Sequence, residues 1–325
     1  MTIGVIGGGA WGTALAQTMA DGPMGEDVLL WAREAQVVAD INTLHENRAF
    51  LPGVKLAPRL CACEDLGALA AADVWLVVSP AQHLRRVLAA APLARRPTLV
   101  LCAKGLEAGS HKLMAEVVRD VADLPLAVLS GPTFAAEVAR GLPTAATLAC
   151  EDDQLGAALV QRLVRGHLRL YQSEDVVGAE IGGAVKNVLA IGCGVVEGAG
   201  LGLNARAALI ARGFAEMQRF GVARGARPET LAGLSGLGDL VLTCTSTNSR
   251  NFSLGVGLGR GQPAAELLAN ARTVAEGAAT APVLVAAARA VGVDMPIASA
   301  VAELLDGASL TDTVNALLAR PLRAE

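Results

Sequence analysis

Residues 3–20 read IGVIGGGAWGTALAQTMA, and this stretch decides the fold of the first half of the chain. Its apolar start is typical of a buried strand, its end has the pattern of a helix, and glycines fill the turn between them. In the motif Gly7-x-Gly9-x-x-Gly12 the first glycine permits a tight turn, the second lets the backbone approach a pyrophosphate, and the third allows close helix–strand packing. Residues 28–31 supply the next strand, so the sequence predicts a Rossmann-type βαβ unit that binds a dinucleotide. The alternative is a glycine-rich turn that holds no ligand.

Strand and helix patterns alternate beyond this unit. Strand-like runs cover 74–78, 98–102, 126–129, 145–148 and 168–171, with helical patterns at 81–91, 109–121 and 153–165. The alternation predicts an α/β fold with a doubly wound, largely parallel sheet. From residue 174 onward only helical patterns are found, at 176–197, 205–220, 228–235, 252–259, 263–269, 279–291, 298–305 and 311–318. We therefore expect a dinucleotide-binding Rossmann domain over residues 1–173 and an all-helical C-terminal domain, which binds the substrate, over residues 174–325.

Composition and charge limit the partners. Hydrophobic residues make up 53% of the 325 and charged residues 18%, which excludes a disordered chain. The formal net charge of −4 and an aromatic content of 3% argue against a nucleic-acid partner, which requires a basic surface and stacking rings. Residues 1–20 carry no charge, but glycines at positions 4, 7, 8, 9 and 12 interrupt any continuous apolar helix there, so we expect no targeting peptide. Elsewhere no uncharged run approaches the ~20 apolar residues of a spanning helix, so we expect no integral membrane segment. An anionic ligand must therefore be held by a local site.

The cysteines predict neither a metal site nor disulfide bonds. The six of them, at positions 61, 63, 102, 150, 193 and 244, lack the paired spacing of a zinc site or of a disulfide-rich domain. We therefore expect no bound metal, and reduced, mostly buried thiols of a cytoplasmic protein.

The residues after the second strand bear on the choice of cofactor. An acidic residue at this place usually binds the ribose 2′-hydroxyl of NAD, whereas an arginine accommodates the 2′-phosphate of NADP. The strand here is followed by Arg33 and then Glu34. Arg33 therefore favours NADP or the use of both cofactors, and Glu34 keeps NAD open. The alternative is a surface arginine without a role in binding.

Two polar segments follow strands at the carboxyl edge of the predicted sheet, where open α/β folds bind their ligands. Lys104 follows the strand over 98–102, and the segment over 130–138, which contains Gly131 and Thr133, follows the strand over 126–129. These residues supply an ammonium, N–H groups and a hydroxyl, which suit a phosphate or carboxylate. The alternative for Lys104 is an exposed lysine that caps the end of an element.

Lys186 is the centre of the predicted catalytic site. Only four of the 27 basic residues are lysine, and Lys186 lies in the most apolar helical stretch of the chain. A buried ammonium loses its proton readily or finds a partner, and an amine that exchanges a proton can act as general acid and base at a carbinol hydroxyl. Asn187 is placed to hold a substrate hydroxyl or carbonyl. The alternative is a lysine that reaches solvent or forms a structural salt bridge.

Two later segments add polar groups. Asp239 stands among glycines and leucines, where it suits the orientation of the lysine or of a sugar-alcohol hydroxyl. Residues 243–251 read TCTSTNSRN, which we interpret as a loop that ends in Ser249, Arg250 and Asn251. Arginine together with N–H and amide donors is well suited to a phosphate dianion. The alternative is a capped turn with an arginine in solvent.

Together these residues closely resemble the bacterial NAD(P)-dependent glycerol-3-phosphate dehydrogenases over essentially the whole chain. The resemblance is carried by GGGAWGTALA at 7–16, Lys104-Gly105, residues 130–138, GAVKNV at 183–188, NARAALI at 204–210, residues 234–246 and Ser249-Arg250-Asn251. The resemblance implies reversible reduction of dihydroxyacetone phosphate to sn-glycerol 3-phosphate, which supplies the glycerol backbone for phospholipid synthesis. It also implies NADP and/or NAD as cofactor and, at the level of the family, a possible homodimer.

The resemblance also implies roles for individual residues. Lys186 matches the proton donor and acceptor, with Asp239 beside it as the second catalytic residue. The cofactor-binding positions are Gly7, Gly9, Ala10, Trp11, Gly12, Arg33, Lys104, Ala135, Arg250, Val274 and Glu276. The substrate-binding positions are Lys104, Gly131, Thr133, Lys186, Asn187, Asp239, Ser249, Arg250 and Asn251.

Two other classes of protein remain as alternatives. A ketopantoate- or 6-phosphogluconate-type dehydrogenase also combines a Rossmann domain with a helical domain that carries a lysine, but the loop ending in Ser249-Arg250-Asn251 argues against it. A redox-sensing regulator that binds NAD(P) without catalysis is disfavoured by the number of polar groups expected at the predicted site, which are Lys104, Lys186, Asp239 and Arg250.

Overall fold

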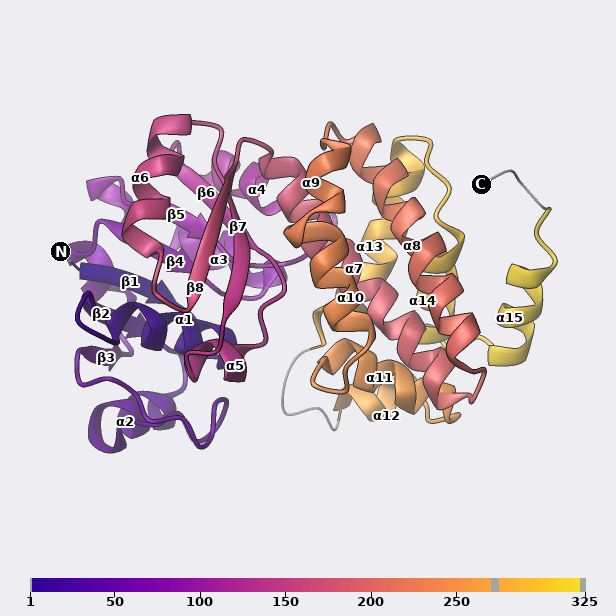
Figure 1. Cartoon of the computed structure of the whole chain (residues 1–325), viewed down its shortest axis with the longest axis horizontal. Helices are drawn as coiled ribbons and strands as arrows, with labels where there is room; N and C mark the ends of the chain where they lie inside the picture. The colour runs from indigo at the N-terminus through magenta and orange to yellow at the C-terminus, as the bar shows by residue number, and fades with distance from the viewer. Residues whose placement is uncertain (1, 270–274, 322–325) are drawn as a thin grey trace. The chain divides into compact units, whose positions relative to one another are not determined.

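The computed structural model describes residues 2–269 and 275–321 and divides into two compact units (Figure 1). The first, here called the sheet unit, comprises Met1–Lys104 and Lys112–Glu180. The second, the helical unit, comprises Gly105–His111 and Ile181–Glu325.

The sheet unit is built on eight strands in the order β3-β2-β1-β4-β5-β6-β7-β8. The strands are β1 (Thr2–Ile6), β2 (Asp27–Trp31), β3 (Leu60–Cys63), β4 (Val74–Val77), β5 (Thr98–Leu101), β6 (Leu126–Ser130), β7 (Thr144–Ala149) and β8 (Leu168–Ser173). Neighbouring strands are parallel except β6 and β7, which are antiparallel. The strand order reverses between β1 and β4, which is the switch point where open sheets of this kind bind ligands. The predicted doubly wound, largely parallel sheet is confirmed.

Helices cover both faces of this sheet. They are α1 (Ala10–Ala20), α2 (Ala35–Leu44), α3 (Leu84–Ala89), α4 (Met114–Val121), α5 (Ala135–Ala139) and α6 (Asp153–Leu163), with short 3₁₀ turns at Leu66–Ala71, Ala81–His83 and Leu93–Arg95. Successive residues of β4 enter different cores: Leu76 belongs to the core that contains residues of α1, α2 and α6, and its neighbour Trp75 belongs to the core that contains residues of α3 and α4. Both faces are therefore buried, which explains the continuous apolar runs of the central strands.

The sheet unit contains elements that the sequence prediction missed or bounded differently. The prediction missed the edge strand β3, which is only four residues long and contains two cysteines, and it missed α2. It also began the helix over 109–121 too early, because α4 begins at Met114. Gly109 and His111 both have positive φ, which interrupts a helix there.

The helical unit contains no strand among its described residues, as predicted. Its helices are α7 (Val176–Gly198, which begins in the sheet unit), α8 (Leu203–Ala223), α9 (Pro228–Ala232), α10 (Asp239–Cys244), α11 (Arg250–Gly259), α12 (Ala264–Ala269), α13 (Glu276–Ala290), α14 (Pro296–Leu305) and α15 (Leu310–Leu318). A π-helical turn at Leu234–Gly238 leads into α10. By length and composition α7 alone among the described helices is able to cross a membrane, but 94% of its most apolar stretch is buried inside the protein. It is the buried central helix that the sequence predicted.

Glycines allow α7 to pack directly on the backbone of α11. A Cβ atom at Gly194 would lie 2.0 Å from the carbonyl oxygen of Phe252, and one at Gly255 would lie 2.0 Å from that of Ile191. Gly198 and Gly259, each four residues further along its helix, repeat the contact. The two helices therefore meet backbone to backbone, at a distance that only glycine permits.

Candidate active site

The glycine turn of the sheet unit has the geometry of a pyrophosphate site. Gly7 has a φ of +123°, which side-chain-bearing residues rarely adopt, and a Cβ at Gly12 would lie 1.9 Å from the Gly7 carbonyl oxygen. A Cβ at Gly9 would meet nothing within 4 Å, so space is open beside this residue. No side chain among the described residues caps the start of α1 at Gly9. The first N–H groups of α1 are thus available to an anion.

Two residues next to this turn are of interest for the rest of a dinucleotide. The indole Nε1 of Trp11, in the first turn of α1, is buried and has no hydrogen-bond partner among the described residues. A buried donor without a partner is uncommon and is consistent with a ligand that completes the site. Arg33 follows β2, its side chain is 73% exposed, and it forms an ion pair of 2.8 Å with Glu34. Its guanidinium is thus accessible at the place where the sequence predicts contact with the cofactor.

The structure brings Lys104, Gly131 and Thr133 together at the carboxyl ends of β5 and β6. Lys104 Nζ donates to the Gly131 carbonyl oxygen at 3.3 Å, and the Thr133 hydroxyl donates to the same oxygen at 3.2 Å. Lys104 and Thr133 are half-buried. Ala135 begins α5 directly after this segment. The sheet unit thus presents an ammonium and a hydroxyl at one point of its ligand-binding edge.

In the helical unit Lys186 and Asp239 form a buried ion pair. Lys186 Nζ donates to Asp239 Oδ1 at 2.6 Å, and the two side chains are 10% and 1% exposed. Lys186 lies within α7 and Asp239 is the first residue of α10. A buried lysine is expected either to lose its proton or to find a partner, and the structure shows that the partner of Lys186 is a carboxylate.

Thr243 completes this arrangement, although it is not among the residues that the sequence predicts for the site. Lys186 Nζ also donates to Thr243 Oγ1 at 3.0 Å, while that hydroxyl donates to the Asp239 carbonyl oxygen at 2.6 Å. The sequence pattern of residues 243–251 predicts a loop, but α10 extends to Cys244, which puts Thr243 one turn after Asp239 on the same helix face. The i, i+4 spacing was the available signal once the helix was recognised.

The π-helical turn before α10 fixes where Asp239 stands. A Cβ at Gly182 of α7 would lie 2.3 Å from the Ser235 carbonyl oxygen, and one at Gly236 would lie 1.9 Å from that of Leu231. The turn therefore packs against α7 one helical turn before Lys186. Glycine at these positions brings the start of α10 close enough for Asp239 to reach the amine.

A chain of amides lies beside the ion pair. Asn251 Nδ2 donates to Asn187 Oδ1 at 3.0 Å, and the Gly277 N–H donates to Asn251 Oδ1 at 2.9 Å. Asn187 and Asn251 are 5% and 8% exposed. Because its oxygen accepts from Asn251, Asn187 has its NH₂ group turned away from that contact. Asn187 is thereby held in a single orientation.

The remaining predicted residues lie at helix starts. The Ser249 hydroxyl caps α11 by accepting from the Phe252 N–H at 3.2 Å, and Arg250, the first residue of α11, is exposed. Glu276 begins α13. Val274 lies outside the described residues.

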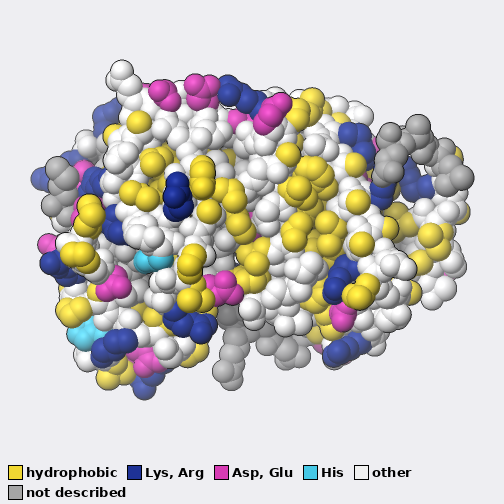
Figure 2. Space-filling model, viewed as in Figure 1, with side chains coloured by type: hydrophobic (Ala, Val, Ile, Leu, Met, Phe, Trp, Pro, Cys, Tyr) yellow, Lys and Arg dark blue, Asp and Glu magenta, His cyan; other side chains and the backbone are white. Residues whose placement is uncertain are grey.

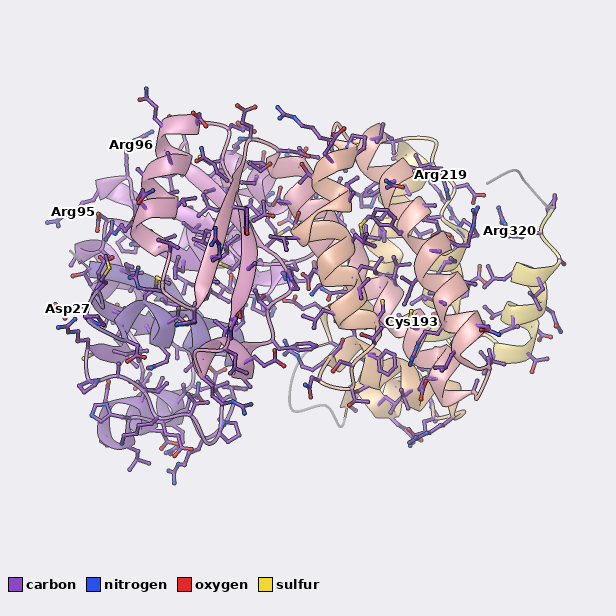
Figure 3. The ribbon with its side chains drawn as sticks, viewed as in Figure 1. Asp27, Arg95, Arg96, Cys193, Arg219 and Arg320 are labelled. Atoms are coloured by element: carbon purple, nitrogen blue, oxygen red, sulfur yellow. The ribbon has the colours of Figure 1, made fainter. Side chains whose placement is uncertain are left out.

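Two cysteine thiols lie behind the ion pair. Cys193 of α7, labelled in Figure 3, and Cys244 of α10 are both fully buried. The hydrogen bond with the Cys193 thiol, together with burial, raises the pKa of Cys244 well above its usual value. The Cys244 thiol therefore remains protonated. The described residues contain no cluster of three or more His, Cys, Asp or Glu side chains suited to a metal ion.

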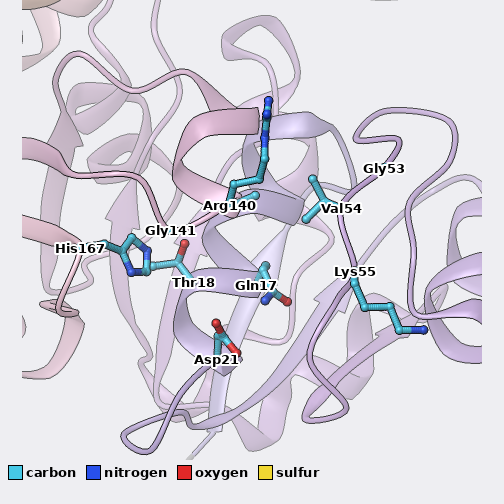
Figure 4. Close-up of a pocket in the computed structure, with 10 residues that line it drawn as sticks. Gln17, Thr18, Asp21, Gly53, Val54, Lys55, Arg140, Gly141 and His167 are labelled. Carbon is cyan, nitrogen blue, oxygen red and sulfur yellow. The ribbon is translucent and has the colours of Figure 1, made fainter.

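A cavity of about 300 Å³ in the sheet unit lies away from these groups (Figure 4). It is found at the far end of α1 from the glycine turn, next to Gln17, Thr18 and Asp21. The Lys55 and Arg140 side chains at its rim extend away from Gln17 and Asp21. None of the predicted site residues lines this cavity.

Comparison with known proteins covers both units. The family model for the N-terminus of NAD-dependent glycerol-3-phosphate dehydrogenase matches residues 2–156, and the model for its C-terminus matches residues 175–315. The chain is 62% identical over 324 residues to glycerol-3-phosphate dehydrogenase (NAD(P)+) 1 of Sphingopyxis alaskensis, covering 99% of this chain and 97% of that protein. It is 59% identical to glycerol-3-phosphate dehydrogenase (NAD(P)+) of Erythrobacter litoralis, with the same coverage.

A solved structure agrees with these relatives. The glycerol-3-phosphate dehydrogenase of Coxiella burnetii is 37% identical and superposes with a TM-score of 0.92, covering 98% of this chain and 99% of that chain. The fold, the family models and the identities lead to the same assignment. The chain belongs to the NAD-dependent glycerol-3-phosphate dehydrogenase family.

Proposed function

We propose that the enzyme catalyses the reversible reduction of dihydroxyacetone phosphate to sn-glycerol 3-phosphate with NADPH or NADH. The observation that carries this proposal is the buried Lys186–Asp239 pair, because the reaction requires a group that gives a proton to a ketone oxygen and takes it back. The names of the relatives supply the substrate class. The product is the glycerol backbone from which phospholipids are made.

The sheet unit would hold the dinucleotide. Its pyrophosphate fits the N–H groups at the start of α1, where Gly7, Gly9 and Gly12 leave room, with Ala10 and Trp11 beside it. Lys104 and Ala135 are proposed cofactor contacts at the carboxyl edge of the sheet. When bound, the dinucleotide supplies the hydride that the carbonyl carbon receives. Arg250, Val274 and Glu276 are proposed as further contacts from residues 181–325.

Arg33 is proposed to set the choice between the two cofactors. Its exposed guanidinium is suited to a 2′-phosphate, and its pairing with Glu34 leaves a carboxylate within reach of a 2′-hydroxyl. We expect Arg33→Ala to raise the KM for NADPH more than the KM for NADH. Arg95, an exposed arginine of the same unit, gives the matched Ala control. Equal effects on the two cofactors would argue against this role.

Lys186 would donate a proton to the carbonyl oxygen as the hydride reaches the carbon. The ketone then becomes a carbinol, the lysine becomes a neutral amine, and Asp239 remains beside it as a carboxylate. In the reverse direction the amine takes the hydroxyl proton, and Asp239 stabilises the ammonium that forms. Thr243 keeps the amine in place through its hydroxyl.

The substrate would be oriented by polar groups at two ends. Asn187, held by Asn251, presents its NH₂ group to the hydroxyl or carbonyl oxygen. Arg250, with Ser249 and Asn251, is proposed to hold the phosphate; Lys104, Gly131 and Thr133 are further proposed substrate contacts. Binding energy from the phosphate orients the reacting carbon, so a substrate without phosphate loses turnover as well as affinity.

The test is to measure initial rates of NADPH and NADH oxidation with dihydroxyacetone phosphate. Dihydroxyacetone, which lacks the phosphate, and ketopantoate are the comparison substrates. We expect turnover with dihydroxyacetone phosphate and much slower turnover with the other two. Tight dinucleotide binding without turnover of any of them would instead favour an NAD(P)-binding regulator.

The site of action and assembly state are also proposed. The six cysteines form no disulfide, which suits the reducing cytoplasm. The helical unit exposes hydrophobic side chains, among them Leu203 and Val222 of α8, and Figure 2 shows such side chains gathered over its helices. We propose a cytoplasmic enzyme that forms a homodimer, which a light-scattering measurement of molar mass tests directly.

A further inference from the structure

The glycine turn is held in place by a residue 39 positions away along the chain. Asn47 lies between α2 and β3, and none of its surface is exposed. Its Nδ2 donates to the Gly8 carbonyl oxygen at 2.8 Å and to Thr13 Oγ1 at 2.8 Å. Its Oδ1 accepts from the Phe50 N–H at 3.1 Å. One buried amide therefore joins the turn, the first helix and its own loop.

The Gly8 carbonyl is the part of the turn that Asn47 controls. Thr13 Oγ1 also donates to this oxygen, at 3.4 Å, so two side chains hold a single carbonyl group. Across a planar trans peptide, the C=O of one residue and the N–H of the next point in opposite directions. By fixing the direction of the Gly8 oxygen, Asn47 therefore also fixes the direction of the Gly9 N–H.

This direction matters for an anion. If the peptide between Gly8 and Gly9 rotated, its carbonyl oxygen would face the bound pyrophosphate in place of an N–H, and the interaction would become repulsive. Glycine offers little resistance to such a rotation, because both of these residues lack a Cβ. The turn therefore needs an external hold, and Asn47 is buried where it supplies one.

The loop that carries Asn47 is itself fixed. Its neighbour Arg48 donates two hydrogen bonds, of 3.0 and 2.9 Å, to the nearly buried Asp40 of α2. The Leu51 N–H donates to the Asn47 carbonyl oxygen at 2.8 Å. Asn47 thus acts from a rigid support, which is what a group that positions another group requires.

We propose that Asn47 is a positioning residue for the dinucleotide, which sets the Gly8–Gly9 peptide so that the Gly9 N–H faces the pyrophosphate. The inference rests on the proposed dinucleotide site. It adds a residue outside the glycine motif whose role is to keep that motif in its binding conformation. Asn47 lies in a stretch of sequence without a recognisable motif, so no pattern points to this role.

The test compares Asn47→Ala and Asn47→Asp with a matched asparagine. The matched residue is Asn42 of α2, whose side-chain amide also forms hydrogen bonds to the backbone. It donates to the Ala62 carbonyl oxygen at 2.9 Å and accepts from the Ala62 N–H at 2.8 Å, and so connects α2 to β3. Asn42→Ala therefore removes similar hydrogen bonds in the same unit without touching the glycine turn.

The quantities to measure are the Kd of NADPH by fluorescence in the absence of substrate, the kcat at saturating NADPH, and the melting temperature. We expect both Asn47 variants to raise the Kd about tenfold or more while kcat changes less than about threefold, because the lost interaction serves binding. Asn42→Ala is expected to lower the melting temperature and leave the Kd unchanged.

Several results would overturn the proposal. One is a folded Asn47 variant that binds NADPH with the wild-type Kd. Another is an equal rise in Kd for Asn42→Ala, which would mean that a general loss of rigidity in the sheet unit weakens binding. If the Asn47 variants do not fold, Thr13→Val removes the second hold on the same carbonyl, and an unchanged Kd there counts against the role. The Kd of NADPH is measured without substrate. Failure of the wild-type enzyme to reduce dihydroxyacetone phosphate would therefore contradict only the proposed reaction and not the role of Asn47.

Discussion

The Nζ atom of Lys186 lies 2.6 Å from Oδ1 of Asp239, although 53 residues separate the two along the chain. Both side chains are nearly closed to water, so the attraction between the ammonium and the carboxylate is screened less than it would be at the surface. After the amine gives up its proton, the adjacent carboxylate favours its return. The pair is therefore suited to repeated proton transfer.

Replacing Lys186 with Met tests the proton transfer. The thioether has a similar length but carries no proton, so we expect kcat to fall by about 10³-fold or more while the Kd of NADPH stays within about twofold. Lys112→Met, at an exposed lysine paired with Asp120, is the matched control and should leave kcat unchanged. Near-normal turnover of Lys186→Met would remove the lysine from its role.

Replacing Arg250 with Ala tests the phosphate contact. Loss of the guanidinium should raise the KM for dihydroxyacetone phosphate about tenfold or more, since a charge-assisted contact to a dianion is lost. The exposed Arg260, at the other end of α11, provides the control, and its Ala variant should keep the wild-type KM. If the KM of Arg250→Ala is unchanged, the phosphate is anchored elsewhere.

Glu180 predicts a dependence of stability on pH. Its carboxyl group is 4% exposed, accepts from the Ala115 N–H of α4 at 2.9 Å, and has its pKa raised by burial from 4.5 to about 8. The folded chain therefore binds this proton more tightly than the unfolded chain. Its contribution to stability is complete below about pH 4.5 and is lost as the pH rises to about 8.

The Glu180→Gln variant cannot undergo this titration. We expect its free energy of unfolding, relative to the wild type, to rise between pH 5 and pH 8 by on the order of a few kcal/mol. Denaturant unfolding at both pH values measures it. Burial also raises the pKa of Glu216, in the helical unit, to about 7. Its titration makes the free energy of unfolding depend on pH in the same direction, so the difference between Glu216→Gln and the wild type should also rise with pH. A constant difference between Glu180→Gln and the wild type at all pH values contradicts the prediction.

The contact between α7 and α11 predicts a large effect of a single methyl group. In Gly255→Ala the new Cβ would lie 2.0 Å from the backbone oxygen of Ile191, so we expect a loss of about 3 kcal/mol in the free energy of unfolding. At Gly257, on the same helix, a Cβ would come closest to the ends of two side chains, Leu267 at 2.7 Å and Gln262 at 2.9 Å, which can shift more readily than a backbone carbonyl group. Gly257→Ala should therefore cost much less, and equal losses in the two variants would refute the backbone contact.

The sequence predicted what periodicity and motif spacing determine. The glycine motif at 7–12 and the apolar runs gave the doubly wound, largely parallel sheet, though not its edge strand β3 or the helix α2, and the apolar stretch around Lys186 gave the buried helix. Asp239 was expected to orient Lys186, and the structure pairs the two. Thr243, the other partner, was out of reach of such reasoning, because its contact depends on how α10 packs against α7. Thr243 was placed in a loop since hydroxyl and amide residues dominate 243–251, whereas packing extends α10 to Cys244. Asn47 was missed for the same reason, because its role exists only once two distant segments meet.

The pairing of Gly194 with Gly255 has a consequence for how this chain can change over generations. Side chains in an ordinary core can drift, since a larger neighbour is compensated by a smaller one. Here the opposing group is the peptide backbone itself, which no mutation can shrink. Accepted replacements of Gly194 or Gly255 should therefore be rare, and any that occur should be accompanied by a displacement of the whole of α11.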